Sequence, residues 1–310
     1  MKFARIIVVA LLAALAGARG ARAQDLEPRA YSPSPIGTNF VAVAVGGTRG
    51  AILFDPAVPI TDVHAELGMA TVGYGRSFGL FGKQGLVLVG VPYAWGYVEG
   101  SVQEEARRVH RDGFGDMRVK ASLNLLGPKA MSLEEFRKAP RRTVLGVSVA
   151  VQAPTGEYDR TKLINLGTGR WAIKPEIGLS VPVGRWYLDT YAGAVFFETN
   201  DQFYPGDATR RQDPLYTLQA HASYTFKNRA WFAIDATWYG GGASTVDSGS
   251  PSERQSNSRL GGTVAVPIAR NQSIKVAAST GTSTRTGTDF DTVLVGWQLT
   301  WFDRPHDRKP

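Results

Sequence analysis

The sequence has no cysteine among its 310 residues. Disulfide-stapled folds, cysteine zinc sites, iron–sulfur clusters and thiol catalysis are therefore excluded. It also lacks an apolar run of the roughly 18 residues that a membrane-spanning helix requires, which excludes a polytopic helical membrane protein. Charged residues make up 20% of the chain, and both signs are interleaved along it. A nucleic-acid-binding protein concentrates lysine and arginine on one face, so we expect no nucleic-acid partner.

Glycine and aromatic residues are plentiful by comparison. The chain has 35 glycines, 14 phenylalanines, 11 tyrosines and 7 tryptophans, and 43% of its residues are hydrophobic. This hydrophobic content is that of a folded protein, because disordered chains bury too little apolar surface. Aromatic residues favour strands, and glycines favour the turns that join them. The composition therefore predicts a large all-β protein.

The first 23 residues have the pattern of a secretory signal peptide. Lys2 and Arg5 precede an apolar run at 6–16, and small residues at 21–23 surround an expected cleavage point. An amphipathic anchor is the alternative, but no polar face recurs through the apolar run. We therefore predict an exported chain that begins near residue 24. Residues 24–36 contain three prolines and are expected to form an extended periplasmic lead-in.

Residues 37–302 alternate apolar and polar side chains in about twelve runs. Glycine, proline, aspartate and asparagine separate the runs, and long connections, such as 99–112, 199–212 and 241–255, alternate with short ones. Lipid offers no hydrogen bonds, so a β-sheet can cross it only as a closed barrel. The pattern predicts a single transmembrane antiparallel up-and-down β-barrel of about 12 strands, with a polar periplasmic tail at 303–310. A secreted sandwich or soluble barrel is the alternative, but its strands average nearer 5–6 residues.

One short connection is longer than expected. Gly127 and Pro128 end a strand, and Ser132 and Glu135 have the spacing of a helix capping box. We therefore predict one short periplasmic helix near 132–139. It would cap or plug that mouth of the barrel, or simply extend the turn.

The polar face of the predicted strands should line the lumen, because a charge on the lipid face costs about 2–4 kcal/mol near the midplane. The residues expected there are Glu66, Arg76, Asp116, Arg118, Lys120, Lys174, Glu176, Asp189, His221, Asp235 and Lys275. Tryptophans at both strand ends should form two aromatic girdles at the membrane interfaces. The girdle residues are Trp95, Trp171, Trp186, Trp238 and Trp301, whereas Trp231 shares the polar face of Asp235.

The lumen charges are compatible with two roles. They could brace a narrow, closed barrel as ion pairs, or line an aqueous path for a polar or anionic solute. Catalytic motifs are weak: His221 and Ser223 share one face and are the only candidate pair for an outer-membrane hydrolase. A lumen histidine with satisfied hydrogen bonds is the favoured explanation of His221. We therefore expect no enzyme, no catalytic residues, no metal and no cofactor.

Several long strings resemble one known family. They include the segments 124–136, 153–158 and 163–171, followed by 212–216, 239–242 and 285–291. In these strings the chain is similar to meta-pathway phenol-degradation proteins over most of its expected mature length. The resemblance implies an outer-membrane β-barrel, often labelled a transporter and named after gene clusters for aromatic degradation. It implies no particular functional residues.

The sequence as a whole predicts an outer-membrane channel or transporter for small organic solutes, aromatic or anionic ones included. Its partners would be outer-membrane lipid and a small solute, and Arg118, Lys120, Lys174 and Lys275 would attract anionic groups. The alternative is a closed structural or interaction barrel that uses the outer loops 199–212 and 241–255 as a docking surface. A hydrolase built on His221 is a third, weaker hypothesis.

Overall fold

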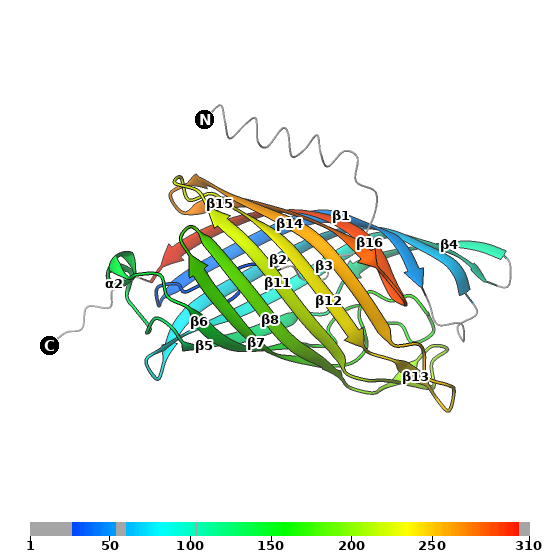
Figure 1. Cartoon of the computed structure of the whole chain (residues 1–310). Helices are drawn as coiled ribbons and strands as arrows, with labels where there is room; N and C mark the ends of the chain where they lie inside the picture. Colours follow the sequence, from blue (N-terminus) through cyan, green and yellow to red (C-terminus); the bar gives the residue numbers. More distant parts are fainter. Residues whose placement is uncertain (1–26, 54–59, 103–104, 304–310) are drawn as a thin grey trace.

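The computed structural model describes residues 27–53, 60–102 and 105–303, and within them β-strands dominate (Figure 1). The expected signal peptide at 1–23 and the tail at 304–310 lie outside the described residues. The elements are β1 Thr38–Leu53, β2 Ile60–Leu80, β3 Lys83–Val102, β4 Glu105–Phe114, β5 Arg118–Leu126, α2 Leu133–Lys138, β6 Val144–Gln152, β7 Ala172–Val183, β8 Trp186–Phe197, β9 Asn200–Phe203, β10 Ala208–Gln212, β11 Leu215–Thr225, β12 Trp231–Gly241, β13 Ser244–Val246, β14 Gln255–Ala269, β15 Gln272–Ser283 and β16 Gly287–Phe302.

Twelve of these strands form a closed antiparallel barrel. The order around the barrel is β1, β2, β3, β5, β6, β7, β8, β11, β12, β14, β15 and β16, and β16 pairs with β1 to close it. Each barrel strand therefore pairs with the barrel strands that come before and after it in the sequence. Since β16 also pairs with β1, no barrel edge is left open. This arrangement confirms the predicted up-and-down barrel.

The two ends of the barrel differ in their connections. At one end, which we call the turn end, short turns join β2 to β3, β7 to β8, and β14 to β15. Phe81 and Gly82 form the first of these turns, and both have positive φ, as tight hairpin turns require. At the opposite end, which we call the loop end, the connections are longer and carry strands of their own (Figure 1).

The predicted short helix is confirmed as α2, which lies at the turn end (Figure 1). The Ser132 hydroxyl accepts a hydrogen bond from the Glu135 N–H, and the Glu135 carboxylate accepts one from the Ser132 N–H. This reciprocal pair satisfies two N–H groups that a helix start would otherwise leave free.

The loop end contains more strand than the sequence predicts. The expected loop 99–112 is instead a hairpin, in which the end of β3 pairs with β4 from Tyr93–Phe114 to Val102–Glu105. The expected loops 199–212 and 241–255 contribute β9, β10 and β13, which form a separate three-stranded sheet. These strands were missed because alternation in polar, exposed segments lacks an apolar face to mark it.

The expected extended lead-in also differs where it is described. Residues 28–31 form a turn, and Tyr31 is 1% exposed. The segment turns because its side chains bind residues of the barrel's inner face, as described below. The chain then passes Ile36, whose N–H donates to the Met131 carbonyl at the turn end, and enters β1.

Candidate functional site: the barrel lumen

Alternate residues of each barrel strand face opposite sides of the wall. In β11, Thr217, Gln219 and Ser223 are buried, whereas Tyr216 and Leu218 are about half exposed. The exposed face carries large apolar residues all round the barrel, among them Ile177, Leu179, Leu188, Ile234 and Leu260. This apolar surface is the one expected to contact lipid, so the buried, polar face lines the lumen.

A cluster of charges lies on the inner face of β5 and β7. The Lys174 ammonium lies 2.6 Å from Oε2 of Glu176, and the Lys120 ammonium lies 3.6 Å from Oε1 of the same carboxylate. Glu176 is nearly buried and also accepts hydrogen bonds from the Tyr31 hydroxyl (3.1 Å) and the Gln219 amide (3.5 Å). Two ammonium groups thus share one carboxylate of the barrel. Burying two ammonium groups beside a single carboxylate costs free energy unless a second negative charge compensates the second ammonium.

The second negative charge comes from the segment that precedes the barrel. The Glu27 carboxylate forms an ion pair with the Lys120 ammonium, in close contact. Lys275 shares this inner face, because it pairs with Ala265 of β14, which in turn lies opposite Trp231 of β12. The lysines expected to line the lumen therefore surround an acid that sequence reasoning did not place there.

Arg29 fixes the same segment against the inner face of β11 and β12. Its guanidinium donates to the Ser223 hydroxyl (2.8 Å) and the Thr225 hydroxyl (2.7 Å), and it lies over the Trp231 ring at 4.6 Å. Its backbone N–H donates to Asp189 (3.2 Å). Trp231 therefore faces inward, as its parity indicated, and supports an arginine instead of contacting lipid.

Tyr31 occupies a socket formed by two glycines. A Cβ atom on Gly146 would lie 2.2 Å from the Tyr31 ring, and one on Gly178 would lie 2.1 Å from it. The ring also contacts Tyr191 edge-on at 5.1 Å between centroids, and its hydroxyl bonds with Ser148 (3.0 Å). The barrel wall is therefore shaped to hold this segment, which we call the plug segment (residues 27–31).

His221 and Asp235 form a buried pair beside the plug segment. Nδ1 of His221 lies 2.7 Å from the Asp235 carboxylate, which also accepts a hydrogen bond from Thr263 (2.9 Å). Ser223, the candidate nucleophile, is fully buried, and its hydroxyl accepts the Arg29 bond. In a catalytic triad the histidine forms a hydrogen bond with the nucleophilic serine. Here the Ser223 hydroxyl instead accepts a hydrogen bond from the Arg29 guanidinium. The pair is therefore best explained as part of the lumen packing.

Asp116 anchors a loop, although sequence analysis placed it in the lumen wall. Its carboxylate accepts four hydrogen bonds, from the N–H groups of Gly156 and Thr168 (2.9 Å each), the Thr168 hydroxyl (2.6 Å) and the Gln152 amide (2.9 Å). These bonds hold the β6–β7 connection, residues 153–171, at the loop end. Ile164 of this connection packs against an apolar cluster on the inner face. Its buried members are Val63, Ala65, Val98 and Phe290.

Arg76 faces outward, which corrects its predicted place in the lumen. It lies opposite Asn39, on the face that carries Tyr74 and Trp301, and it forms an ion pair with Asp303 at 2.7 Å. The end of β2 extends past the apolar band, so a charge on the outer surface meets polar surroundings there. Alternation indicates the face of a residue but not its depth.

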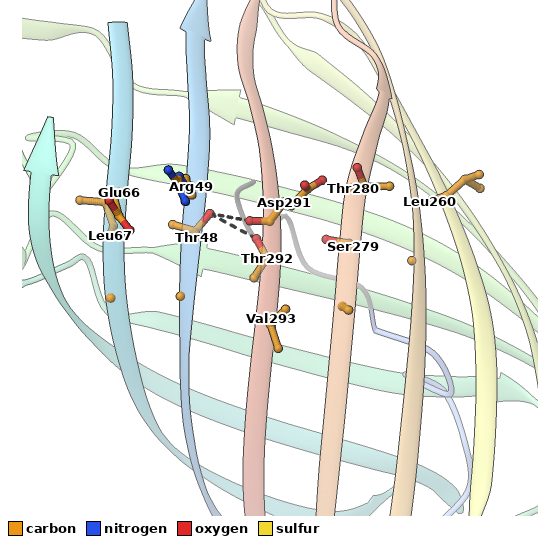
Figure 2. A pocket seen from close by; sticks show the side chains of 14 residues that line it. Thr48, Arg49, Glu66, Leu67, Leu260, Ser279, Thr280, Asp291, Thr292 and Val293 are labelled. Atoms are coloured by element: carbon orange, nitrogen blue, oxygen red, sulfur yellow. Dashed lines mark hydrogen bonds between the residues drawn. The ribbon is translucent and has the colours of Figure 1, made fainter. Parts of the chain in front are cut away.

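Glu66 also faces outward, which is a second correction. It pairs with Tyr97 of β3 on one side and Arg49 of β1 on the other, one residue pair beyond Trp95. It lines a hollow of about 890 Å³ on the outer wall, shown in Figure 2. Two rows of outward-facing residues flank one inward-facing row there. The lining residues are Gly47, Thr48, Arg49, Glu66, Leu67, Gly68, Leu260, Gly261, Ala278, Ser279, Thr280, Asp291, Thr292 and Val293.

The remaining residues expected in the lumen lie on inward-facing positions. Arg118 and Lys120 alternate along β5 and pair with Gln152 and Ala150 of β6. Asp189, His221 and Asp235 form one row across β8, β11 and β12. The structure thus brings Lys120, Lys174 and Glu176 into one cluster and Asp189, His221 and Asp235 into a neighbouring one.

The five girdle tryptophans are all exposed, but Trp95 lies within β3 and not at its end, because that strand runs on to Val102. Trp186 and Trp301 lie at the turn end, where Trp186 contacts Tyr224 (5.2 Å between centroids) and Phe232 (5.8 Å). The other three lie toward the loop end: Trp95, Trp171 and Trp238. Trp95 covers Gly68, where a Cβ atom would lie 2.3 Å from its ring.

Sequence reasoning missed several inner residues. Arg259 of β14 is buried, and its guanidinium donates to the Phe290 carbonyl and to Ser279. It shares the parity of Thr263, so the alternation of this strand could have identified it. Glu27, Arg29 and Tyr31 precede the first strand, and no periodic signal marks them.

Among the residues that the structure describes, no helix is long and apolar enough to span a membrane. These residues contain no group of three or more histidine, aspartate or glutamate side chains that could hold a metal ion.

Known proteins resemble this chain in its barrel fold and in its sequence family. No curated relative matches the chain. An outer membrane channel from Pseudomonas putida F1 is similar in structure, with a TM-score of 0.73 and 18% identity over 89% of this chain and 100% of that one. The transport unit of the autotransporter AIDA-I from Escherichia coli aligns with a TM-score of 0.52 and 12% identity, over 90% and 93% of the two chains. Both likenesses concern the barrel fold.

The family comparison covers most of the barrel. The model described as "Putative MetA-pathway of phenol degradation" matches residues 46–296, from the middle of β1 to near the end of β16. The resemblance seen in the sequence strings is therefore confirmed, and the chain belongs to this family of phenol-degradation-pathway barrel proteins.

Proposed function

We propose that the chain is a channel of the bacterial outer membrane that passes small organic solutes, in particular solutes with a carboxylate on an aromatic ring. The observation that carries this proposal is the lumen cluster in which Lys120 and Lys174 share Glu176. Ammonium groups in a poorly hydrated lumen attract anions more strongly than the same groups in water. The cluster would therefore give an anionic solute a binding step inside the barrel.

The wall next to this cluster suits the rest of such a solute. The inward positions of β1, β2, β3 and β16 carry uncharged residues, some polar, such as Thr48 and Thr292, and others apolar. By register the apolar ones include Ala42, Ala44, Met69, Leu86, Leu88 and Leu294, and Leu88 lies directly beside Lys120. The inward positions of β5 to β12 carry most of the charges and hydrogen-bonding groups. A flat aromatic acid can place its ring against the first wall and its carboxylate against the second.

Two other observations support the proposal. The family description refers to phenol degradation, and the similar protein from Pseudomonas putida F1 is described as an outer membrane channel. An outer-membrane location also fits the signal peptide expected at residues 1–23 and the exposed apolar belt of the barrel. Under this proposal the turn end faces the periplasm, and outer-membrane lipid surrounds the belt.

The test is transport by the purified, folded protein. In planar bilayers under a potassium chloride gradient we expect a reversal potential on the anion-selective side, and in liposomes we expect faster uptake of benzoate than of benzylamine. The variant K174E should reduce both preferences. If the folded protein gives neither conductance nor solute flux in either system, the channel function is wrong.

The alternative of a closed structural or interaction barrel is favoured by one specific observation. The plug segment packs against the lumen wall, and Tyr31, Tyr191 and Ser223 are essentially buried there. A barrel of this kind would act through the sheet of β9, β10 and β13 at the loop end. The liposome experiment separates the two functions, since a closed barrel passes no solute at any concentration.

A further inference from the structure

The Glu27 carboxylate lies where the proposed channel would bind an anion. It neutralises Lys120, the ammonium group that Glu176 satisfies least well, because Glu176 lies 2.6 Å from Lys174 but 3.6 Å from Lys120. Glu27 is not a residue of the barrel wall, because it precedes β1 by eleven positions. Of the two ammonium groups that share Glu176, Lys120 is therefore the one whose charge the Glu27 carboxylate compensates.

The plug segment holds this carboxylate in place through its other residues. Arg29 and Tyr31 make the bonds to Ser223, Thr225, Ser148 and Glu176 described above. Glu27 is less buried than the residues that hold the segment: its side chain is 37% exposed, whereas Tyr31 is 1% exposed. The Glu27 side chain can therefore leave Lys120 by rotating, without withdrawal of Arg29 or Tyr31 from their sites.

We propose that Glu27 is a tethered competitor for the carboxylate of the transported solute. The inference rests on the proposed channel function and adds the binding site and its regulation. Lys120 forms the site, with Lys174 beside it, and a solute carboxylate replaces the carboxylate of Glu27. The exchange is one carboxylate for another, so the buried Lys120 ammonium is never left without a counter-charge.

This competition sets the affinity of the site. A tethered carboxylate has a high effective concentration, so it keeps the site closed to weakly bound or dilute anions. A solute that adds ring contacts with the apolar wall displaces it, whereas chloride or acetate gains nothing from that wall. The arrangement favours aromatic acids over small anions and makes passage depend on solute concentration.

The variant E27Q tests the proposal in the full-length protein, because it keeps the shape of the side chain and removes its charge. We expect benzoate to block the chloride current of E27Q at a concentration roughly tenfold lower than for the wild type, which corresponds to about 1.4 kcal/mol. Block by uncharged benzyl alcohol should not change. E134Q is the matched control, because Glu134 lies on α2, outside the lumen cluster, and pairs with Lys138.

Two results would overturn the inference. One is an unchanged benzoate block in a folded, conducting E27Q protein, which would leave the channel function standing. The other is a tighter block that persists in the double variant E27Q/K120Q, because the site would then not involve Lys120. A wild type that conducts no ions and passes no solute would instead refute the channel function itself. Heat-dependent migration on gels shows that each variant is folded.

Discussion

At the scale of single residues, two glycines of the barrel wall make room for the Tyr31 ring in the lumen. Gly146 and Gly178 lie on adjacent strands, and both lack the Cβ atom that would collide with the Tyr31 ring. The buried carboxylate of Glu176 then meets a phenol hydroxyl instead of an unpaired space. The same ring lies 5.9 Å from the Lys120 ammonium, so packing and charge are coupled at this point.

We therefore expect G178A to destabilise the protein. The added methyl would lie 2.1 Å from Tyr31, and overpacking of this kind costs about 1–3 kcal/mol. Thermal unfolding in detergent should show a lower Tm for G178A than for the control G90A, whose methyl would meet nothing closer than 3.9 Å.

A double-mutant cycle identifies the cause. In a Y31A background the same G178A substitution should cost less, because the closer of the two rings that it strikes is absent and only the approach to Tyr191, at 2.8 Å, remains. An equal loss of stability in both backgrounds would show that the socket does not act through Tyr31.

At the scale of elements, α2 is held by its first turn. Two hydrogen bonds from Ser132 hold the pKa of the Glu135 carboxyl below its ordinary value. A carboxylate of this kind stabilises its helix at pH values above its ordinary pKa, and the contribution is lost as the pH falls through the lowered value. The helix should therefore fray in acid before the barrel does.

The variant S132A removes one of these two bonds and should raise the pKa of Glu135 part of the way to its ordinary value. Carbon-detected NMR of glutamate-labelled protein measures that pKa directly. S256A, on the exposed end of β14, should leave the Glu135 titration unchanged. A Glu135 titration that is identical in S132A and the wild type would refute the capping box.

The connection between β6 and β7 depends on Asp116 in the same way. D116N replaces two acceptor oxygens by one, so the bonds to Gly156 and Thr168 cannot all remain. We expect hydrogen exchange in residues 153–171 to become at least several-fold faster. D112N is the control, because Asp112 bonds with Tyr93 on the β3–β4 hairpin. Equal protection of the connection in D116N and the wild type would contradict its role as an anchor.

The sequence predicted the strands and the helix better than it predicted which residues line the lumen. Alternation located the twelve barrel strands and the capping box located α2, because both signals are local. The outward positions of Glu66 and Arg76 were missed because every strand charge was expected in the lumen, although both share the parity of the exposed Val72 and Tyr74. A charge on the outer face is tolerated where the strand extends past the apolar band. The position of the plug segment depends on a socket that forms only when the barrel closes. The sequence of residues 27–31 alone therefore could not predict that this segment lies in the lumen.

At the scale of the whole molecule, the barrel has three surfaces of different chemistry. The outer belt is apolar, one side of the lumen is charged, and the inward positions of β1, β2, β3 and β16 on the other side are uncharged. A protein in water would hide the first surface. Its exposure over many strands requires a lipid environment, since apolar patches on soluble monomers rarely exceed a few hundred Å².

The position of this belt in the membrane can be tested by placing an arginine at each of two outward-facing positions at different heights along the barrel. Ile234 is 60% exposed and lies between the Trp186 cluster and Trp238, one outward position from Phe232 and two from Trp238. Tyr216 lies one outward position beyond Trp238. In lipid vesicles I234R should lower the free energy of unfolding by about 2–4 kcal/mol, because an arginine at the midplane loses its hydration. Y216R should cost no more than about 1 kcal/mol, because its guanidinium reaches the headgroups.

Reversible urea unfolding in vesicles, followed by tryptophan fluorescence, gives both values. In a barrel surrounded by water both substitutions would fall on an exposed surface, where most changes stay within about 0.5 kcal/mol. Equal, small effects at the two positions would therefore show that this belt does not lie in a membrane. A large effect confined to Ile234 would show that Ile234 lies within the apolar layer of the membrane and that Tyr216 lies at or beyond its edge.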